Sequence, residues 1–221
     1  ALGRMAAGIA HEIKNPLAGM LLFSSNLSKK VPPEGPLREG LDVIVRETVR
    51  CKSIIQELLE FSRDRKPQMV LTDVNEVIEK AVSILDNEFR LKHLKLEKIL
   101  SPQMEKICLD GNQMEQVFVN ILINAVQATP ENGIITVRSA WLPNPRVVRI
   151  HIADTGCCIS AENLPKVFEP IFSTKEKGTG LGLAVSYGIV KGHGGTIRVS
   201  SVEGKGTEFT IDLPSRGQSE K

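Results

Sequence analysis

The feature that most constrains this chain is a change of hydrophobic period close to residues 63–67. Before it, apolar and small side chains recur every three or four residues, which is typical of helices that share a buried stripe. Beyond Thr72, helical segments alternate with short runs in which every second residue is apolar, as in half-buried strands. A chain of 221 residues, 41% of them hydrophobic, can bury a core in each part. The predicted domains are residues 1–63 and 73–214, with a linker at 64–72 and a frayed tail at 215–221.

The first part predicts an antiparallel helical hairpin, because two apolar seams are separated by the proline-rich stretch 31–36. The residues of the two seams are Ala6, Ile9, Ile13, Pro16, Met20, Phe23 and Leu27, and then Leu37, Leu41, Ile44, Thr48, Cys51, Ile55 and Leu58. Further apolar residues, such as Leu17 and Leu21, flank the seams, so each helix carries a stripe wider than one neighbour can cover. We therefore expect two copies to pair into a dimeric four-helix bundle.

The second part predicts an α/β sandwich. The expected helices are residues 74–91, 113–128 and 181–191, and the expected strands are 95–100, 106–110, 134–140, 147–153, 196–201 and 207–213.

Charge and cysteine usage narrow the class of protein. The 28 basic and 26 acidic residues nearly cancel, which leaves no broad field for a nucleic-acid partner. The apolar runs are far shorter than the roughly 20 residues of a membrane-spanning helix, so we expect membrane association only through a segment upstream of Ala1. The four cysteines form no C-x-x-C pair and no disulfide framework, which favours a reducing cytoplasm.

His11 is the first candidate catalytic residue. It lies two positions after Ile9 and two before Ile13, so the helical period turns its ring away from the seam. A solvent-facing imidazole with the ordinary pKa of about 6.5 is largely neutral at pH 7 and keeps a nucleophilic lone pair. Glu12 could hold its tautomer, and Asn15, one turn on, could position a water. From spacing alone, an ordinary surface histidine remains the alternative.

Two segments of the second part carry oxygen ligands. Asn120 and Asn124 lie one turn apart on the predicted helix 113–128, with Gln127 extending the polar face, and amide oxygens can hold Mg²⁺ without repelling a triphosphate. Asp154 ends a strand, just before Gly156, where a carboxylate could accept a hydrogen bond from the amine of a base. Surface asparagines and a simple Asx turn are the alternatives.

Two further segments could bind phosphate and base. The glycine-rich stretch 178–183 leads into a helix, so its amides and the helix N-terminus can face phosphate. It is neither a Walker loop, lacking Lys-Ser/Thr after the second glycine, nor a Rossmann turn, since no strand precedes it. The loop before it contains Phe168, Phe172 and Lys175, which fit a lid with aromatic anchors and a cation near phosphate. A merely packed loop is the alternative.

Taken in order, these motifs resemble the five conserved boxes of bacterial sensor histidine kinases. They read His11-Glu12-Ile13-Lys14-Asn15-Pro16-Leu17, Asn120-x-x-x-Asn124, Asp154-x-Gly156, Phe168-x-Pro170-x-Phe172 and Gly178-x-Gly180-x-Gly182. Each motif alone is common, but their joint order and spacing are specific and cover nearly the whole chain. The stretches 124–128 and 171–175 are also similar to nitrogen-regulation-type sensors.

The resemblance implies a dimerising histidine-phosphotransfer hairpin followed by a catalytic domain of the gyrase, chaperone and kinase ATPase superfamily. It implies that His11 takes the γ-phosphoryl group of ATP and passes it to an aspartate on a response-regulator receiver domain. Glu12 would be the general base, and Asn15 would serve dephosphorylation of the regulator. Asp154 would read adenine, supported by Thr207. The implied nucleotide-binding residues are Asn120, Asn124, Gln127, Asp154, Gly156, Phe172, Lys175, Gly178, Thr179, Gly180, Leu181, Gly182 and Thr207, with Asn124 at the Mg²⁺.

One departure from the family pattern supports an alternative function. The first glycine box normally reads Asp-x-Gly-x-Gly, but Cys158 replaces its second glycine. If that position needs a positive φ, a side chain there is strained by about 1 kcal/mol or more. The alternative is therefore a nucleotide-binding but catalytically impaired dimeric scaffold. We interpret Cys157 and Cys158 as buried small residues, and His93, His151 and His193 as structural or incidental.

A plain ATPase is a third hypothesis. It is disfavoured because Asn120 stands where hydrolytic relatives of the superfamily carry a water-activating glutamate, and because a hairpin precedes the domain.

Overall fold

The computed structural model describes residues 2–62, 67–175 and 178–215. The chain divides into two compact units, residues 1–65 and 66–221. Among the described helices, none combines the length and the apolar character needed to span a lipid bilayer.

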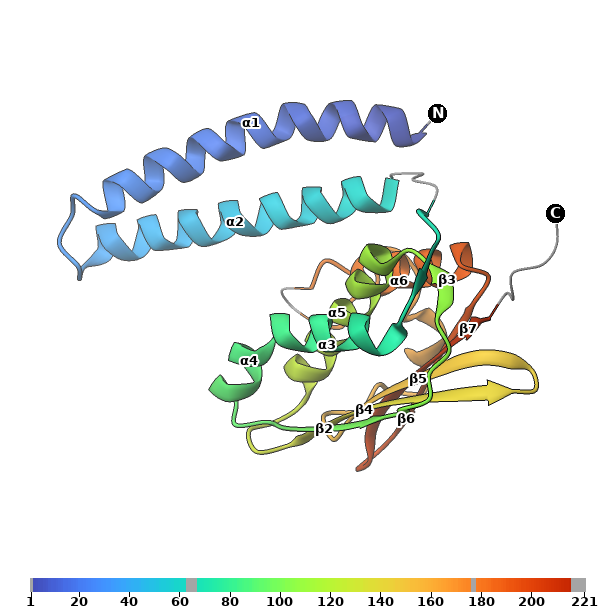
Figure 1. Cartoon of the computed structure of the whole chain (residues 1–221). Coiled ribbons are helices and arrows are strands. Elements are labelled where there is room, and N and C mark those ends of the chain that lie inside the picture. The colour runs from blue at the N-terminus through green and yellow to red at the C-terminus, as the bar shows by residue number, and fades with distance from the viewer. Residues whose placement is uncertain (1, 63–66, 176–177, 216–221) are drawn as a thin grey trace. The chain divides into compact units, whose positions relative to one another are not determined.

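The first unit is an antiparallel hairpin of α1 (Leu2–Ser28) and α2 (Pro36–Ser62) (Figure 1). Pro36 begins α2, where its fixed φ and missing N–H carry no cost. At the end of α1, Arg38 donates to the backbone oxygen of Ser28 at 2.7 Å and to the carboxylate of Asp42, which also accepts from the Ser28 hydroxyl. These bonds satisfy the last turn of α1 and join the two helices at the bend.

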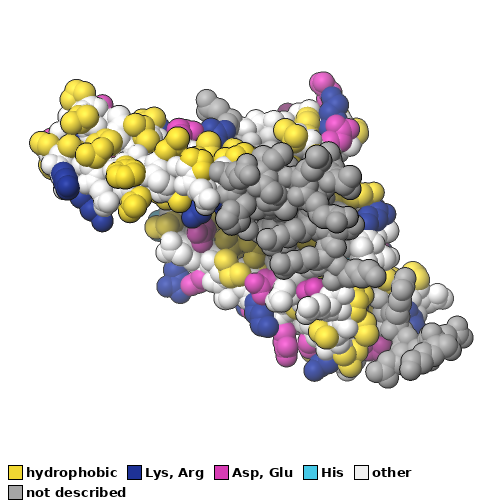
Figure 2. Space-filling view, turned by 90° about the horizontal axis from the view of Figure 1, so that it is seen from above, with side chains coloured by type: hydrophobic (Ala, Val, Ile, Leu, Met, Phe, Trp, Pro, Cys, Tyr) yellow, Lys and Arg dark blue, Asp and Glu magenta, His cyan; other side chains and the backbone are white. Residues whose placement is uncertain are grey.

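The face that α1 turns toward α2 is not the predicted seam. Ser24 and Ser28 are buried on α1, whereas Met20, Phe23 and Leu27 of the predicted seam are 55%, 71% and 52% exposed. The face containing Leu17, Leu21, Ser24 and Ser28 packs inward instead. The apolar stripe of α1 is wider than one helix can cover, as expected, so one side of it packs on α2 while the predicted seam residues stay exposed in the single hairpin. Figure 2 shows hydrophobic side chains left on the outer surface of the hairpin.

The second unit is a layer of helices on one face of a five-stranded sheet (Figure 1). The sheet order is β2-β4-β5-β7-β6, in which β2 runs parallel to β4 and all other pairs are antiparallel. The strands of this sheet are β2 (Lys95–Leu100), β4 (Ile134–Pro143), β5 (Arg146–Asp154), β6 (Thr196–Val202) and β7 (Gly206–Pro214). The helical segments are α3 (Val74–Ile84), α4 (Asp86–Leu91), α5 (Gly111–Ala128), α6 (Gly182–Gly192) and the short 3₁₀ helix η1 (Leu164–Lys166).

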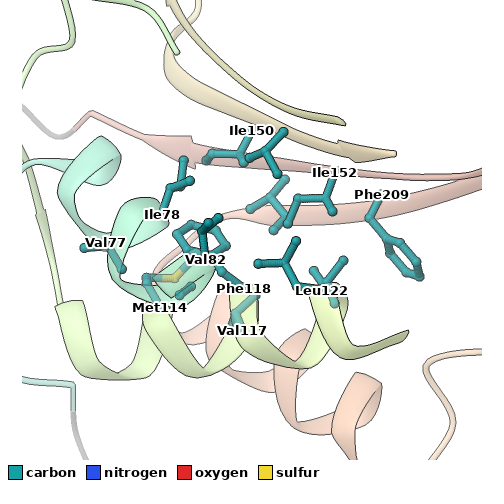
Figure 3. Packing of buried hydrophobic residues seen from close by; sticks show 14 of the residues in the cluster. Val77, Ile78, Val82, Met114, Val117, Phe118, Leu122, Ile150, Ile152 and Phe209 are labelled. Carbon is teal, nitrogen blue, oxygen red and sulfur yellow. The ribbon is translucent and has the colours of Figure 1, made fainter. Parts of the chain in front are cut away.

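The core of this unit lies between α5 and the sheet. Figure 3 shows Phe118 and Leu122 of α5 facing Ile150 and Ile152 of β5, and all four are at most 2% exposed. Alternate residues of β5 point to the other face, as a strand requires. Since the apolar side of α5 is buried here, its polar side is directed away from the sheet.

The secondary structure departs from the predictions at two places. The predicted helix 74–91 is interrupted at Leu85, whose φ and ψ of −103° and 9° separate α3 from α4. The predicted linker 64–72 ends in a strand, β1 (Val70–Thr72), which pairs with β3 (Ile107–Leu109). β1 forms because β3 offers it an unpaired edge. Residues 63–66 and the tail beyond Ser215 lie outside the described residues.

Candidate nucleotide-binding site

The amide side chains of the candidate site lie on the polar face of α5. The helix begins after Asp110, whose carboxylate caps it by accepting from the backbone N–H groups of Asn112 and Gln113 at 3.1 Å. The apolar period that buries Phe118 and Leu122 leaves Asn120, Asn124 and Gln127 on the opposite side.

Asn120 joins α5 to the start of α6. Its Nδ2 donates to the backbone oxygen of Gly182 at 3.1 Å and to Oγ of Ser186 at 3.4 Å. One turn later, Asn124 donates from Nδ2 to the backbone oxygen of Asn120 at 3.0 Å. The amide nitrogens of Asn120 and Asn124 thus donate to groups of the protein. The side-chain oxygens of both residues are the atoms that can accept a hydrogen bond or hold a cation.

Lys175 bridges two of the amide oxygens on α5. Its Nζ donates to Oδ1 of Asn124 at 2.7 Å and to Oε1 of Gln127 at 2.6 Å. Desolvation of the ammonium lowers the pKa of Lys175, while the nearby Cys157 and Asp154 act in the opposite direction. The ammonium group is a cation held by two amide oxygens, and oxygen is the ligand atom that Mg²⁺ prefers. The oxygen ligands at this position therefore fit the predicted Mg²⁺.

Asp154 ends β5 in a buried position, with 6% of its surface exposed. Its Oδ1 accepts a hydrogen bond from the backbone N–H of Gly156 at 2.8 Å. Burial raises the pKa of Asp154, and the hydrogen bonds from the backbones of Gly156 and Thr207 only partly offset this. Thr207 lies opposite on β7, is equally buried, and shares a 3.0 Å hydrogen bond with the hydroxyl of Ser201.

Gly156 brings the Asp154 turn against the end of α5. A Cβ at this position would lie 2.5 Å from the backbone carbon and oxygen of Ala128. The next residue, Cys157, donates its N–H to the same oxygen at 3.0 Å. This close approach brings the carboxylate of Asp154 near the side-chain amides of α5. Only glycine permits it, because any Cβ would collide with the backbone of Ala128.

The glycine-rich segment precedes α6. The N–H of Leu181 donates to Oγ1 of Thr179 at 3.3 Å, and α6 then begins at Gly182. Gly180 has a φ of +70° and accepts a 3.0 Å hydrogen bond from the N–H of Ile171. A Cβ on Gly180 would collide with the Ile171 backbone, so the predicted glycine is required on two grounds. Gly178 donates to the backbone oxygen of Lys175 at 3.1 Å.

The two aromatic residues of the preceding loop differ in environment. Phe172 is half-buried. Phe168 instead packs against Tyr187 and Phe209, with ring centroids 5.5 and 6.4 Å away. Phe168 therefore holds the base of the loop on the core rather than acting as an open anchor.

The strain considered for Cys158 does not occur. Among described residues other than glycine, φ is positive at His93, Asn132 and Ile171. Cys158 is half-buried, and its Sγ donates to the backbone oxygen of Val202. Cys157 is exposed and Cys158 is only half-buried, so the interpretation of both cysteines as buried was wrong. In the described part of the chain, no cluster of three or more His, Cys, Asp or Glu residues could hold a metal.

Sequence reasoning missed Ser186 and Lys92. Ser186 is fully buried on α6, where it donates to Gly182 at 2.9 Å and accepts from Asn120. Lys92 donates to the backbone oxygens of Val126 and Thr129 at the end of α5. The only sequence feature that could have indicated Ser186 is its position one helical turn after Gly182. Nothing local marks Lys92, which is far from α5 in sequence.

The residues of the hairpin motif lie on α1. The side chains of His11 and Glu12 lie outside the described residues, whereas Asn15 is described and exposed. In the second unit, His193 has a structural role, because its Nε2 accepts from the N–H of Asp110 at 3.0 Å and its Nδ1 contacts the backbone oxygen of Ile189.

Two family models match consecutive parts of the chain. The His Kinase A (phospho-acceptor) domain matches residues 1–67, and the histidine kinase-, DNA gyrase B- and HSP90-like ATPase matches residues 109–217. The sensor histidine kinase ZraS of Klebsiella oxytoca is 38% identical over 218 residues, which are 99% of this chain and 47% of ZraS. Sporulation kinase E of Bacillus subtilis is 38% identical over 223 residues, 100% of this chain and 29% of that kinase. The chain thus spans about half or less of these relatives.

Two solved structures share the fold of this chain. The histidine kinase ThkA, crystallised in complex with the response regulator protein TrrA, superposes with a TM-score of 0.72 at 27% identity, over 99% of this chain and 63% of that one. Full-length ShkA, in complex with AMPPNP, has the same fold, with a TM-score of 0.81 at 22% identity over 96% of this chain and 45% of that one.

The fold and the site define a phospho-acceptor helical hairpin followed by an ATPase-type nucleotide-binding domain. The chain belongs to the two-component sensor histidine kinases.

Proposed function

We propose that this chain catalyses ATP-dependent autophosphorylation of His11 and transfers the phosphoryl group to an aspartate of a response-regulator receiver domain. The observation that carries the proposal is the position of Lys175, whose ammonium lies between the oxygens of Asn124 and Gln127. Through this contact the Asn124 oxygen holds a cation close to the glycine-rich start of α6, which is what a Mg²⁺-triphosphate site needs.

The residues of this site have separable roles in the proposal. The buried carboxylate of Asp154, held by Gly156 and neighbouring Thr207, accepts a hydrogen bond from the adenine amine. Asn124 holds Mg²⁺, while Asn120 fixes the start of α6. The remaining proposed nucleotide-binding residues are Gln127, Phe172, Lys175, Gly178, Thr179, Gly180, Leu181 and Gly182. Bound Mg²⁺ would neutralise phosphate charge during transfer.

The hairpin would supply the acceptor and the partner surfaces. His11 is the phosphoryl acceptor, with Glu12 as its general base. Exposed apolar residues of α1, among them Phe23, form the homodimer contact, and exposed Asn15 positions water for dephosphorylation of the regulator. The complex of ThkA with TrrA supports a receiver domain as the partner. Because the reaction consumes ATP, we place this part of the protein in the cytoplasm.

Asn120 also favours transfer over hydrolysis. It contributes an amide donor to Gly182 and Ser186 rather than a carboxylate that could activate water. The phosphoryl group then waits for the better acceptor, His11.

The test is phosphorylation of the full chain with γ-labelled ATP and Mg²⁺. We expect label on the protein that is labile to acid and stable to alkali, and its loss in His11→Gln. Binding of AMPPNP should be the same in His11→Gln as in the unmodified chain. Steady phosphate release without protein label would indicate a plain ATPase instead. Nucleotide binding without either product would indicate the impaired scaffold.

The dephosphorylation role has its own test. Asn15→Ala should retain autophosphorylation and slow the loss of phosphate from a phosphorylated receiver domain at least tenfold, or by about 1.4 kcal/mol in activation free energy. Equal dephosphorylation rates would remove Asn15 from the proposal.

A further inference from the structure

The side chain of Lys175 occupies the position that the proposed function assigns to Mg²⁺. Its Nζ lies 2.7 Å from Oδ1 of Asn124 and 2.6 Å from Oε1 of Gln127, which are short, charge-assisted hydrogen bonds. Lys175 follows the α5 residues by 51 and 48 positions, so tertiary structure alone creates this contact.

Two cations at the single side-chain oxygen of Asn124 would repel each other. The Nδ2 of Asn124 is a hydrogen-bond donor and bonds the backbone oxygen of Asn120, so Oδ1 is the atom of this side chain that can hold a cation. A Mg²⁺ ligand must approach within about 2.1 Å, and an ammonium at hydrogen-bond distance from the same oxygen repels the incoming ion. Metal binding at Asn124 is therefore weakened as long as the ammonium stays at this oxygen.

We propose that Lys175 is an internal cation that competes with Mg²⁺ for Oδ1 of Asn124 in the nucleotide-free protein. This inference rests on the proposed function, since it assumes that Asn124 binds Mg²⁺. The competition determines when Mg²⁺ can bind. Mg²⁺ enters only together with a nucleotide, because the phosphates of the nucleotide offer the displaced ammonium of Lys175 a new partner. Mg²⁺ alone does not release it.

The experiment measures AMPPNP binding to the full chain by calorimetry over a series of Mg²⁺ concentrations. Lys175→Met removes the ammonium and keeps most of the side-chain length. We expect the half-saturating Mg²⁺ concentration to fall about three- to tenfold, the range for a charge-assisted contact discounted for solvent exposure. In EDTA the same variant should bind AMPPNP more weakly, because the phosphates lose a cation. Lys166→Met, which removes a lysine from η1, should leave both measurements unchanged.

A second variant keeps the inference testable if Lys175→Met disturbs the loop. Gln127→Leu removes one of the two oxygens that hold the ammonium and leaves Asn124 in place, so it should lower the half-saturating Mg²⁺ concentration in the same direction. Combining both changes should add little to Lys175→Met, because both act through one contact.

The outcomes separate the two proposals. If Lys175→Met and Gln127→Leu bind AMPPNP with an unchanged or higher Mg²⁺ requirement, the competition is refuted and the proposed function stands. If the unmodified chain binds no AMPPNP at any Mg²⁺ concentration, the proposed function itself fails.

Discussion

Asp154 and Thr207 lie opposite each other on β5 and β7, with only 6% and 5% of their surfaces exposed. Burying the ionised carboxylate of Asp154 costs free energy, because the charge is removed from water. For the same reason, burial raises the pKa of Asp154. A ligand amine that donates a hydrogen bond to this carboxylate would offset that cost.

Asp154→Asn should change the base that the site prefers. The Asn oxygen can still accept from Gly156, so its amide nitrogen would face the adenine amine, donor against donor. We expect ATP affinity to fall about tenfold or more, since an unsatisfied buried donor costs about 1–3 kcal/mol. ITP, with an oxygen in place of the amine, should lose less. Titrations of both nucleotides check this, and equal losses would argue against a base-reading role.

The same variant should alter the pH dependence of stability. The folded carboxyl binds its proton more tightly than the unfolded one, whose pKa is near 3.8. Its contribution to stability is therefore present below that value and lost as the pH rises through the folded pKa. Urea unfolding at about pH 4 and pH 7 should show Asp154→Asn gaining stability relative to the unmodified chain as the pH rises.

Gly156→Ala should destabilise the second unit. The new Cβ would meet the backbone of Ala128 at 2.5 Å, and backbone cannot give way like a flexible side chain. We expect a loss of about 2–3 kcal/mol in the free energy of unfolding. Gly188→Ala is the matched control, because nothing lies within 4 Å of that position on α6 and alanine is the better helix former. The control should be neutral or gain up to about 1 kcal/mol, and a Gly156→Ala variant that behaves the same way would contradict the close approach.

Asp212→Asn should cost stability at neutral pH and lose that effect in acid. The carboxylate accepts two hydrogen bonds from Arg149, at 2.6 and 2.9 Å, and one from Arg198 at 2.8 Å. The hydrogen bonds from Arg149 and the one from Arg198 lower the pKa of Asp212 and outweigh the opposing effect of burial. Its contribution is present above the unfolded value of 3.8 and is lost as the pH falls through the lowered folded pKa.

We expect Asp212→Asn to lower the free energy of unfolding by about 1 kcal/mol at pH 7, a figure discounted for solvent screening. The difference should shrink as the pH falls below about 4. Glu208→Gln, on the same strand, should have a smaller effect, because Glu208 contacts only one arginine, Arg138 at 3.0 Å, together with His151 at 3.3 Å. A difference that does not depend on pH would show that packing, not charge, stabilises this site.

Cys158→Gly should not improve the protein. Since φ at Cys158 is not positive, glycine relieves no strain and adds flexibility to the unfolded chain. We expect a loss of about 0.5–1 kcal/mol in stability and nucleotide affinity within about twofold of the unmodified chain. Cys158→Ala provides the comparison without added flexibility. A large rise in autophosphorylation in Cys158→Gly would instead support the impaired scaffold.

Phe23→Glu should weaken the homodimer. Phe23 is 71% exposed on the outer face of α1, where Met20 and Leu27 are exposed as well. Burying a new charge in an apolar contact is costly, so we expect the dimer dissociation constant to rise at least about tenfold. Sedimentation equilibrium measures this, with Lys29→Glu as an exposed control outside the apolar stripe. An unchanged dimer would place the contact elsewhere.

The hydrophobic period located the hairpin and most strands within a few residues, because helices and strands repeat at 3.6 and 2.0 residues. The same period could not say which side of α1 meets α2, since its stripe is wide enough for two partners. It also missed β1, a three-residue strand that forms only because β3 offers an edge.

The order of the five motifs and the residue types at the site were determined by the sequence alone, since both are local properties of the chain. Only the tertiary structure decided that Asn120 meets Gly182, that Lys175 meets Asn124, and that Gly156 lies against Ala128. The first two contacts join residues 62 and 51 positions apart. The first exists because α5 and α6 pack side by side on one sheet, and the second because the loop before α6 returns to α5. Periodicity describes which face of an element is apolar, whereas the packing of those faces decides which polar groups meet at their edges.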